Sequence, residues 1–66
     1  MEFLGRAKIR LEHWIAHNDQ HNDEYEAFAQ QLEQAGKAES AKCVREMMAL
    51  ISKSNECLRN ALKALE

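Results

Sequence analysis

The sequence predicts an all-α protein, an antiparallel two-helix hairpin, from three observations. The first is composition: no proline occurs, glycine appears only at Gly5 and Gly36, and the strong helix formers Ala, Leu, Glu, Lys, Gln, Arg and Met dominate. The second is the position of helix-breaking residues, because "QAGKAES" is the single strong break in helical sequence among the 66 residues. The third is a heptad repeat of apolar residues on each side of that break, which is typical of a coiled coil.

The first helix is expected over about residues 3–35. Its a and d positions are almost all apolar or aromatic, as a helix with one buried stripe requires. The two polar exceptions, Asn18 and His21, fall in adjacent layers at the centre of the helix. The repeat assigns the a positions to Leu4, Leu11, Asn18, Tyr25 and Leu32, and the d positions to Ala7, Trp14, His21, Phe28 and Ala35.

The break is expected to be a turn at about residues 36–37, followed by a second helix over about 38–65. Gly36 suits the left-handed position just past a helix end. Lys37 and Ala38 are weak caps, although Glu39 favours a first turn. The polar exception in this helix is Asn55; the a and d positions are Ala41, Met48, Asn55 and Leu62, with Val44, Ile51, Leu58 and Leu65.

Folding the chain at Gly36 predicts which layers meet. In an antiparallel pair each a position faces a d position of the partner helix. The register with its centre nearest residue 38 places His21 opposite Asn55, with Asn18 one layer away beside Leu58. We therefore predict a polar core layer of Asn18, His21 and Asn55. The apolar layers expected from the same register pair Leu32 with Val44, Phe28 with Met48, Tyr25 with Ile51 and Trp14 with Leu62.

A second stripe on the second helix predicts self-association. One hairpin can cover only one stripe, and a chain of 66 residues rarely buries enough surface alone. The simplest solution is a homodimer of hairpins, a four-helix bundle with two-fold symmetry. The alternative is a marginally stable monomer with exposed small residues. The expected dimer face consists of Cys43, Met47, Leu50, Cys57 and Ala61, within a stripe that also holds Ser54 and Ala64.

Charge, hydropathy and motifs exclude several classes of function. The net charge of −2 gives no support to nucleic-acid binding. No apolar run approaches the roughly 20 residues of a membrane span, so we expect a cytoplasmic protein. Neither a catalytic triad nor a glycine-rich phosphate loop is present, so we expect no enzyme. Cys43 and Cys57 lie roughly 21 Å apart along one helix, so they cannot form a disulfide with each other within it. We expect them to be reduced, buried apolar residues; the alternatives are a bridge between subunits and metal ligation.

The histidines allow two interpretations. His13, His17 and His21 are spaced i, i+4 and i+8, so neighbours share one face of the helix, close to Glu24. One interpretation is a transition-metal site for Zn, Ni or Co that uses these four residues; the second helix offers no histidine. The other is a buried hydrogen-bonded layer of His21 and Asn55 that fixes register and partner number, and whose histidine could make assembly sensitive to pH.

The run from Leu11 to Leu65 resembles a group of short prokaryotic helical domains of unknown function. They share a W-I-x-H-N-x-x-H-x-x-E-[FY] pattern, a glycine turn and a late asparagine in the second helix. The resemblance implies a helical hairpin and indicates that the polar layer is the feature to test. It carries no assigned activity, and His13 lies outside its pattern. The matching positions are Trp14, Ile15, His17, Asn18, His21, Glu24, Tyr25, Gly36, Asn55, Ala61 and Leu62.

Together these observations predict a non-catalytic small helical protein for self-assembly or partner binding, without a cofactor. The alternative is a transition-metal-binding protein.

Overall fold

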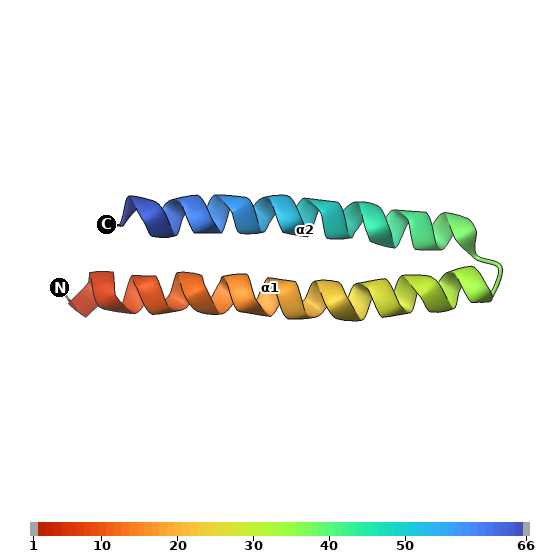
Figure 1. Ribbon diagram of the computed structural model, residues 1–66, viewed down its shortest axis with the longest axis horizontal. Coiled ribbons are helices and arrows are strands. Elements are labelled where there is room, and N and C mark those ends of the chain that lie inside the picture. Colours follow the sequence, from red (N-terminus) through yellow and green to blue (C-terminus); the bar gives the residue numbers. More distant parts are fainter. Residues whose placement is uncertain (1, 66) are drawn as a thin grey trace.

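The chain is a single antiparallel helical hairpin (Figure 1). The computed structural model describes residues 2–65, with helix α1 at Glu2–Gln34 and helix α2 at Ala38–Ala64. These bounds differ from the expected ones by one residue at three of the four helix ends. The Cα positions extend over 53 × 14 × 11 Å, so the molecule is a rod only two helices thick. The start of α1 and the end of α2 lie at the same end of the rod, opposite the turn.

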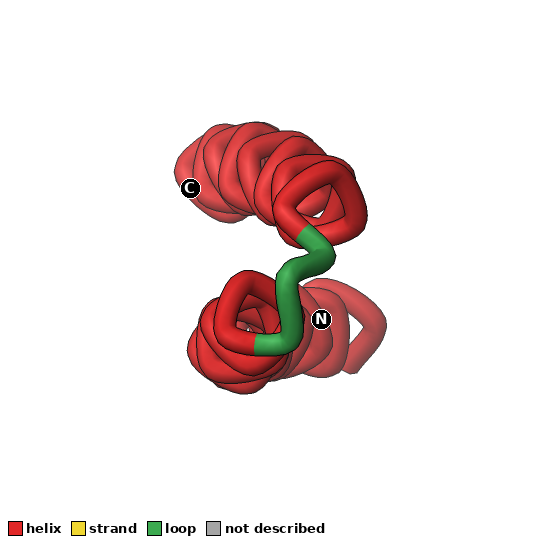
Figure 2. Tube along the Cα trace, turned by 90° about the vertical axis from the view of Figure 1, so that its right-hand side faces the viewer, coloured by secondary structure: helices red, strands yellow, loops and turns green. Residues whose placement is uncertain are grey.

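The turn is built around a glycine in the left-handed conformation. Gly36 has a φ of +79°, and it is the one position in the described chain with a positive φ. The Lys37 N–H donates to the Leu32 carbonyl (2.8 Å) and the Gly36 N–H to the Glu33 carbonyl (3.0 Å). This pair of bonds is the Schellman motif, which satisfies the last carbonyls of α1. The loop then crosses directly to α2 (Figure 2), whose first turn has no side-chain cap at Lys37.

Helix α2 presents to α1 the stripe that the heptad predicted. Ala41 and Asn55 are its two fully buried residues. The other predicted core positions that are covered are Val44, Met48, Ile51, Leu58 and Leu62, all of which are half-buried. The expected a and d positions of this helix are therefore correct from Ala41 to Leu62.

Helix α1 presents a different stripe from the expected one. Its a positions from Leu11 to Leu32 are covered as predicted, but the a position Leu4 is 51% exposed, and Trp14 and Phe28 are 46% and 52% exposed. Ile15, Asn22 and Ala29, which follow three of the expected d positions, are covered, so the prediction of Trp14 and Phe28 as core residues is wrong, whereas His21 is half-buried. Buried or half-buried positions of α1 are Ala7, Leu11, Ile15, Asn18, His21, Asn22, Tyr25, Glu26, Ala29 and Leu32. The spacing between helices depends on side-chain size at the contact, so small residues such as Ala29 allow a closer approach than aromatic rings.

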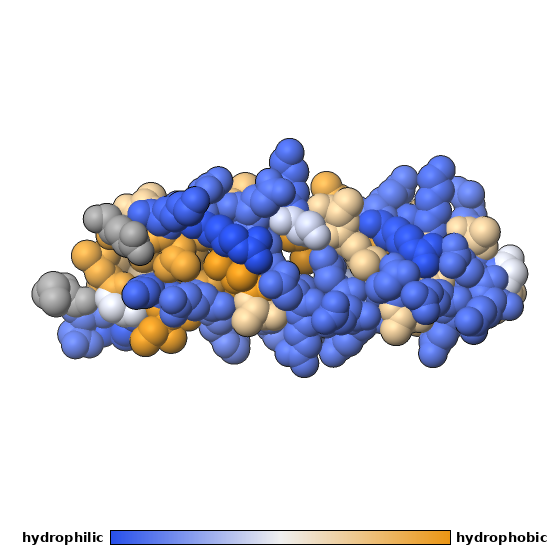
Figure 3. All heavy atoms as spheres, in the orientation of Figure 1, coloured by the Kyte–Doolittle hydropathy of each residue, from blue (hydrophilic) through white to orange (hydrophobic). Residues whose placement is uncertain are grey.

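The two helices leave much of their apolar surface uncovered. Ala29 and Ala41 are the only fully buried apolar residues within residues 2–65. Figure 3 shows one broad face of the rod, on which hydrophilic side chains predominate and apolar ones gather between the helices, in the half away from the turn. Within residues 2–65, neither helix has an apolar segment long enough to cross a membrane.

Candidate functional site

The hairpin has a hydrogen-bonded polar cluster around the buried residue Asn55 at mid-length. Asn55 is 1% exposed. Its Nδ2 donates to the backbone carbonyl of Ile15 (3.1 Å) and to Oδ1 of Asp19 (2.9 Å). Both of those oxygens can only accept, which fixes the orientation of the Asn55 amide. Its Oδ1 therefore faces Asn18, whose Nδ2 donates to it at 2.8 Å.

The cluster reaches the surface through Asp19. While Oδ1 of Asp19 binds Asn55, its Oδ2 lies 3.5 Å from an Nη2 nitrogen of Arg59. Two consecutive residues of α1, Asn18 and Asp19, thus hold one buried amide of α2 from both sides. An amide with three bonds in a buried position specifies one register, because sliding either helix by a turn would leave its polar atoms without partners.

Asn55 meets Asn18 and not His21, so the predicted register is wrong by nearly one turn. The residue of α1 that faces the next layer is Asn22, whose Nδ2 donates to the Met48 carbonyl and to Oγ of Ser52, both at 3.2 Å. Oδ1 of Asn22 is buried without a hydrogen-bond partner within residues 2–65. Sequence analysis had left out Asp19 and Asn22. The signal for Asn22 was present: it follows Asn18 by four residues and precedes Tyr25 by three, an alternative core spacing.

The histidines form a column along one side of α1. The ring centroids of His13 and His17 are 5.7 Å apart, those of His17 and His21 are 4.3 Å apart, and the His21 ring stacks on Tyr25 at 5.7 Å. Nδ1 of His21 lies 3.2 Å from a carboxylate oxygen of Glu24. Within residues 2–65 of one chain, no three His, Cys, Asp or Glu side chains are arranged to hold a single ion.

One long side of the helix pair is charged. Arg45 of α2 bridges two carboxylates of α1, with bonds of 3.0 and 3.1 Å to Glu26 and of 2.6 and 3.2 Å to Glu33. These hydrogen bonds lower the pKa of both carboxyls and raise the pKa of the guanidinium. The Asp19–Arg59 pair lies on the same side, which we call the charged face.

The opposite side is apolar. Each helical residue is rotated by about 100° from the previous one, so residues that follow a core position turn to one side and residues that precede it turn to the other. Arg45 follows the core residue Val44 on the charged face, whereas Trp14, which precedes Ile15, lies on the other side. We call this side the apolar face; it consists of Phe3, Trp14 and Phe28 of α1 with Cys43, Met47, Leu50, Cys57 and Ala61 of α2, and it includes the column of histidines.

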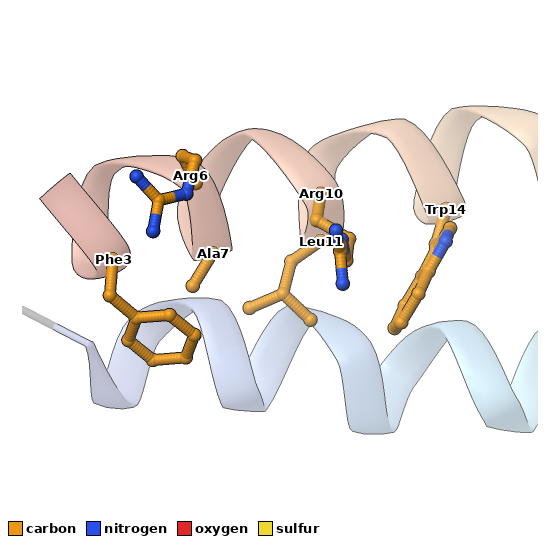
Figure 4. A pocket seen from close by; sticks show the side chains of 6 residues that line it. All are labelled: Phe3, Arg6, Ala7, Arg10, Leu11 and Trp14. Atoms are coloured by element: carbon orange, nitrogen blue, oxygen red, sulfur yellow. The ribbon is translucent and has the colours of Figure 1, made fainter.

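The apolar face is hollowed near the end opposite the turn. A hollow of about 390 Å³ lies among six side chains of α1, with Phe3 and Trp14 at its two ends. Figure 4 shows Phe3, Ala7, Leu11 and Trp14 pointing from α1 toward α2, with the Arg6 and Arg10 side chains beside them. The hollow therefore has an apolar floor and two cationic groups at its rim.

Comparisons with known proteins give the family. The model of a domain of unknown function, DUF8180, matches residues 7–65, which is nearly the whole chain. No curated protein and no solved structure matches the chain. The chain therefore belongs to the DUF8180 family.

Proposed function

We propose that this DUF8180 protein is a non-catalytic assembly protein that pairs with a second copy of itself through the apolar face. The observation that carries the proposal is the one-sided distribution of exposed apolar residues. Phe3, Trp14 and Phe28 of α1 share one side of the rod with Met47 and Leu50 of α2, and all five are exposed. Exposed apolar patches of this kind mark interaction sites on soluble proteins.

The exposed area supports a partner of the size of this chain. The accessible surface is 5148 Å² for a chain of 7.6 kDa. A compact monomer of that mass would expose about 4,300 Å², so the hairpin exposes roughly 850 Å² more. This excess is close to the roughly 800 Å² that each partner buries in a standard protein interface. One copy seated along the apolar face would bring the exposed area per chain into the ordinary range.

Charge favours a reversed orientation of the second copy. The half of the rod nearer the turn, residues 18–55, has seven acidic and four basic side chains, a net charge of −3. The other half, residues 2–17 and 56–65, has three acidic and five basic side chains, a net charge of +2. Two hairpins side by side with opposite directions place each positive half against a negative half. The same direction would place like charges together.

The reversed arrangement also fills the hollow. When the two rods overlap completely, the two-fold axis passes the middle of α1, near Asn18. Phe28 lies ten residues after Asn18, and the floor of the hollow, Ala7 and Leu11, lies eleven and seven residues before it. Phe28 of one copy is therefore level with the hollow of the other, and its ring would pack there beside Arg10, a favourable cation–π partner.

Measurement of the molar mass in solution tests the proposal. Light scattering at micromolar concentration should give twice the chain mass of 7.6 kDa. Leu50→Glu should shift the mass to that of the monomer. Burial of a leucine contributes about 1.5–3 kcal/mol, and two are lost per dimer, so the dissociation constant should rise at least about 100-fold.

Ile9→Glu is the matched control. Ile9 is 67% exposed and Leu50 is 70% exposed, so both substitutions place a charge on an open position. Ile9 is two residues from Ala7 on one side and two residues from Leu11 on the other. Two residues correspond to a rotation of about 200° around the helix, so Ile9 points away from α2 and from the apolar face. It should leave the dimer intact. A monomer mass for the unsubstituted chain, or equal effects of the two substitutions, would contradict pairing through this face.

A further inference from the structure

We propose that the dimer binds one transition-metal ion of the zinc class at its two-fold axis, through His17 and His21 of both copies. This inference rests on the reversed dimer proposed above. Within one chain the two imidazoles are neighbours on the apolar face, with ring centroids 4.3 Å apart. Two nitrogens one helical turn apart form a chelate, but they fill only half of the tetrahedral shell that zinc prefers.

The contact between His21 and Glu24 prepares His21 to bind a metal. A carboxylate can only accept a hydrogen bond, so Nδ1 of His21 carries the proton in its 3.2 Å bond to Glu24. The lone pair of the neutral ring is then on Nε2, which is the atom left for an ion. A carboxylate on the second ring nitrogen is the usual companion of a metal-bound histidine, because it fixes the tautomer and makes the ligand more basic. Sequence analysis gave Glu24 the role of a metal ligand. The structure instead assigns it as a positioning residue that orients His21.

The symmetry of the dimer supplies the missing half of the site. His17 and His21 precede and follow the middle of α1, at Asn18, by one and three residues. With the two-fold axis one residue beyond this middle, level with Asp19, His17 of one copy lies opposite His21 of the other. Four imidazoles then converge within about one helical turn along the axis. His13 lies a full turn further out, so it is placed outside the set.

The charge around this level favours a cation. Asp19, Asp23 and Glu24 lie within three residues of His21, and the nearest basic side chain in α1 is Arg10. Across the helix pair, Arg59 is paired with Asp19 on the charged face. Glu24 is the carboxylate on the side of the histidines, so two copies bring two such carboxylates to the axis, where they stabilise a divalent ion electrostatically.

Zinc titration by calorimetry tests the site, using protein without a histidine tag and freed of metal with EDTA. Zn²⁺ should bind with a stoichiometry of one ion per two chains, and Co²⁺ should give the visible absorption of a tetrahedral complex. His17→Ala and His21→Ala should each abolish binding, whereas His13→Ala should leave it unchanged. Binding of one ion per chain, no heat of binding, or binding that survives His21→Ala would overturn the proposal.

Glu24→Gln separates the positioning role from a merely structural one. It should weaken Zn²⁺ binding by about 10- to 100-fold without changing the stoichiometry. Asp23→Asn is the matched control, because it removes the same charge one residue away on a different side of the helix. Equal effects of both changes would reduce Glu24 to a general electrostatic contribution and contradict the positioning role.

The molar mass in EDTA distinguishes this inference from the assembly proposal. A dimer that takes up no zinc would overturn the metal site and leave self-assembly standing. A chain that is monomeric in EDTA and dimeric with zinc would support the site and show that the apolar face alone is insufficient. A chain that is monomeric in both conditions would overturn both.

Discussion

Replacing Asn55 by alanine removes the centre of the polar cluster, and its cost follows from the bonds that the amide makes. Asn55 forms three hydrogen bonds, one of them to an ionised carboxylate, and is almost fully buried. Each such bond contributes a net 0.5–1.5 kcal/mol or so, with the charged acceptor Asp19 at the upper end. The amide of Asn18 would also lose its partner. We expect Asn55→Ala to lower the free energy of unfolding by about 3 kcal/mol, a large part of the roughly 5 kcal/mol of a small domain.

Urea unfolding followed by far-ultraviolet circular dichroism measures this loss, at one fixed protein concentration because dimerisation contributes to the apparent stability. Asn60→Ala is the control, since Asn60 is an exposed asparagine five residues further along α2. Its effect should stay within about 0.5 kcal/mol. If the two variants unfold at the same urea concentration with the same slope, the cluster contributes nothing to stability and the reasoning fails.

Three further predictions follow from the fold. The double substitution Asn18→Leu with Asn55→Leu should raise the free energy of unfolding, since both partners of a buried bond are replaced, and should yield a mixture of masses by light scattering if the polar layer selects partner number. Gly36→Ala should lower the free energy of unfolding by about 1–2 kcal/mol because φ is +79° there. Gly5→Ala, inside α1 with open space around it, should raise the free energy of unfolding by about 0.5–1 kcal/mol. Changes of the same sign for the two variants in urea unfolding would refute this. The two glutamates that Arg45 binds have pKa values below the ordinary 4.5, so the unfolded chain binds more protons in acid, and their stabilisation is present above about pH 4.5 and lost as the pH falls through the lowered values. Arg45→Met should therefore flatten the rise of the unfolding free energy with pH between roughly pH 3 and 5, and an unchanged slope would contradict this assignment.

The sequence predicts α2 better than α1 for a physical reason. On α2 a second apolar stripe also runs beside the core positions, but several of its members, such as Cys43, Cys57 and Ala61, are smaller than the core residues next to them. From Ala41 to Leu62 the predicted stripe is the one that faces α1. On α1 two overlapping stripes satisfy the same heptad, because Trp14 stands beside Ile15 and Phe28 beside Ala29. The aromatic residues offer the larger apolar area, but the contact with α2 takes the smaller neighbours. Periodicity cannot make this choice, since it depends on the size of what lies opposite.

The polar layer was predicted in kind but not in register. Asn18 and Asn55 were both expected near the core, and their amides are bonded at 2.8 Å. His21 was expected opposite Asn55, yet its ring bonds to Glu24 on its own helix. A register that differs by nearly one turn leaves the apolar pattern almost unchanged. Hydrogen-bond geometry therefore decides between the alternatives, and sequence spacing does not report that geometry.

The mistaken assignment on α1 bears on function. Trp14, His21 and Phe28 repeat every seven residues, as residues do when they face a helix. Helix α2 of the same chain covers them only in part, since Trp14 and Phe28 are about half exposed and the side chain of His21 is 39% exposed. A core-like stripe outside the core is expected where a second helical surface docks, because exposing it to water would otherwise cost solubility without a gain in stability. We infer that one stripe of α1 packs against α2 and that the other, Trp14, His21 and Phe28, packs against a second hairpin. His21 lies in the middle of this second stripe.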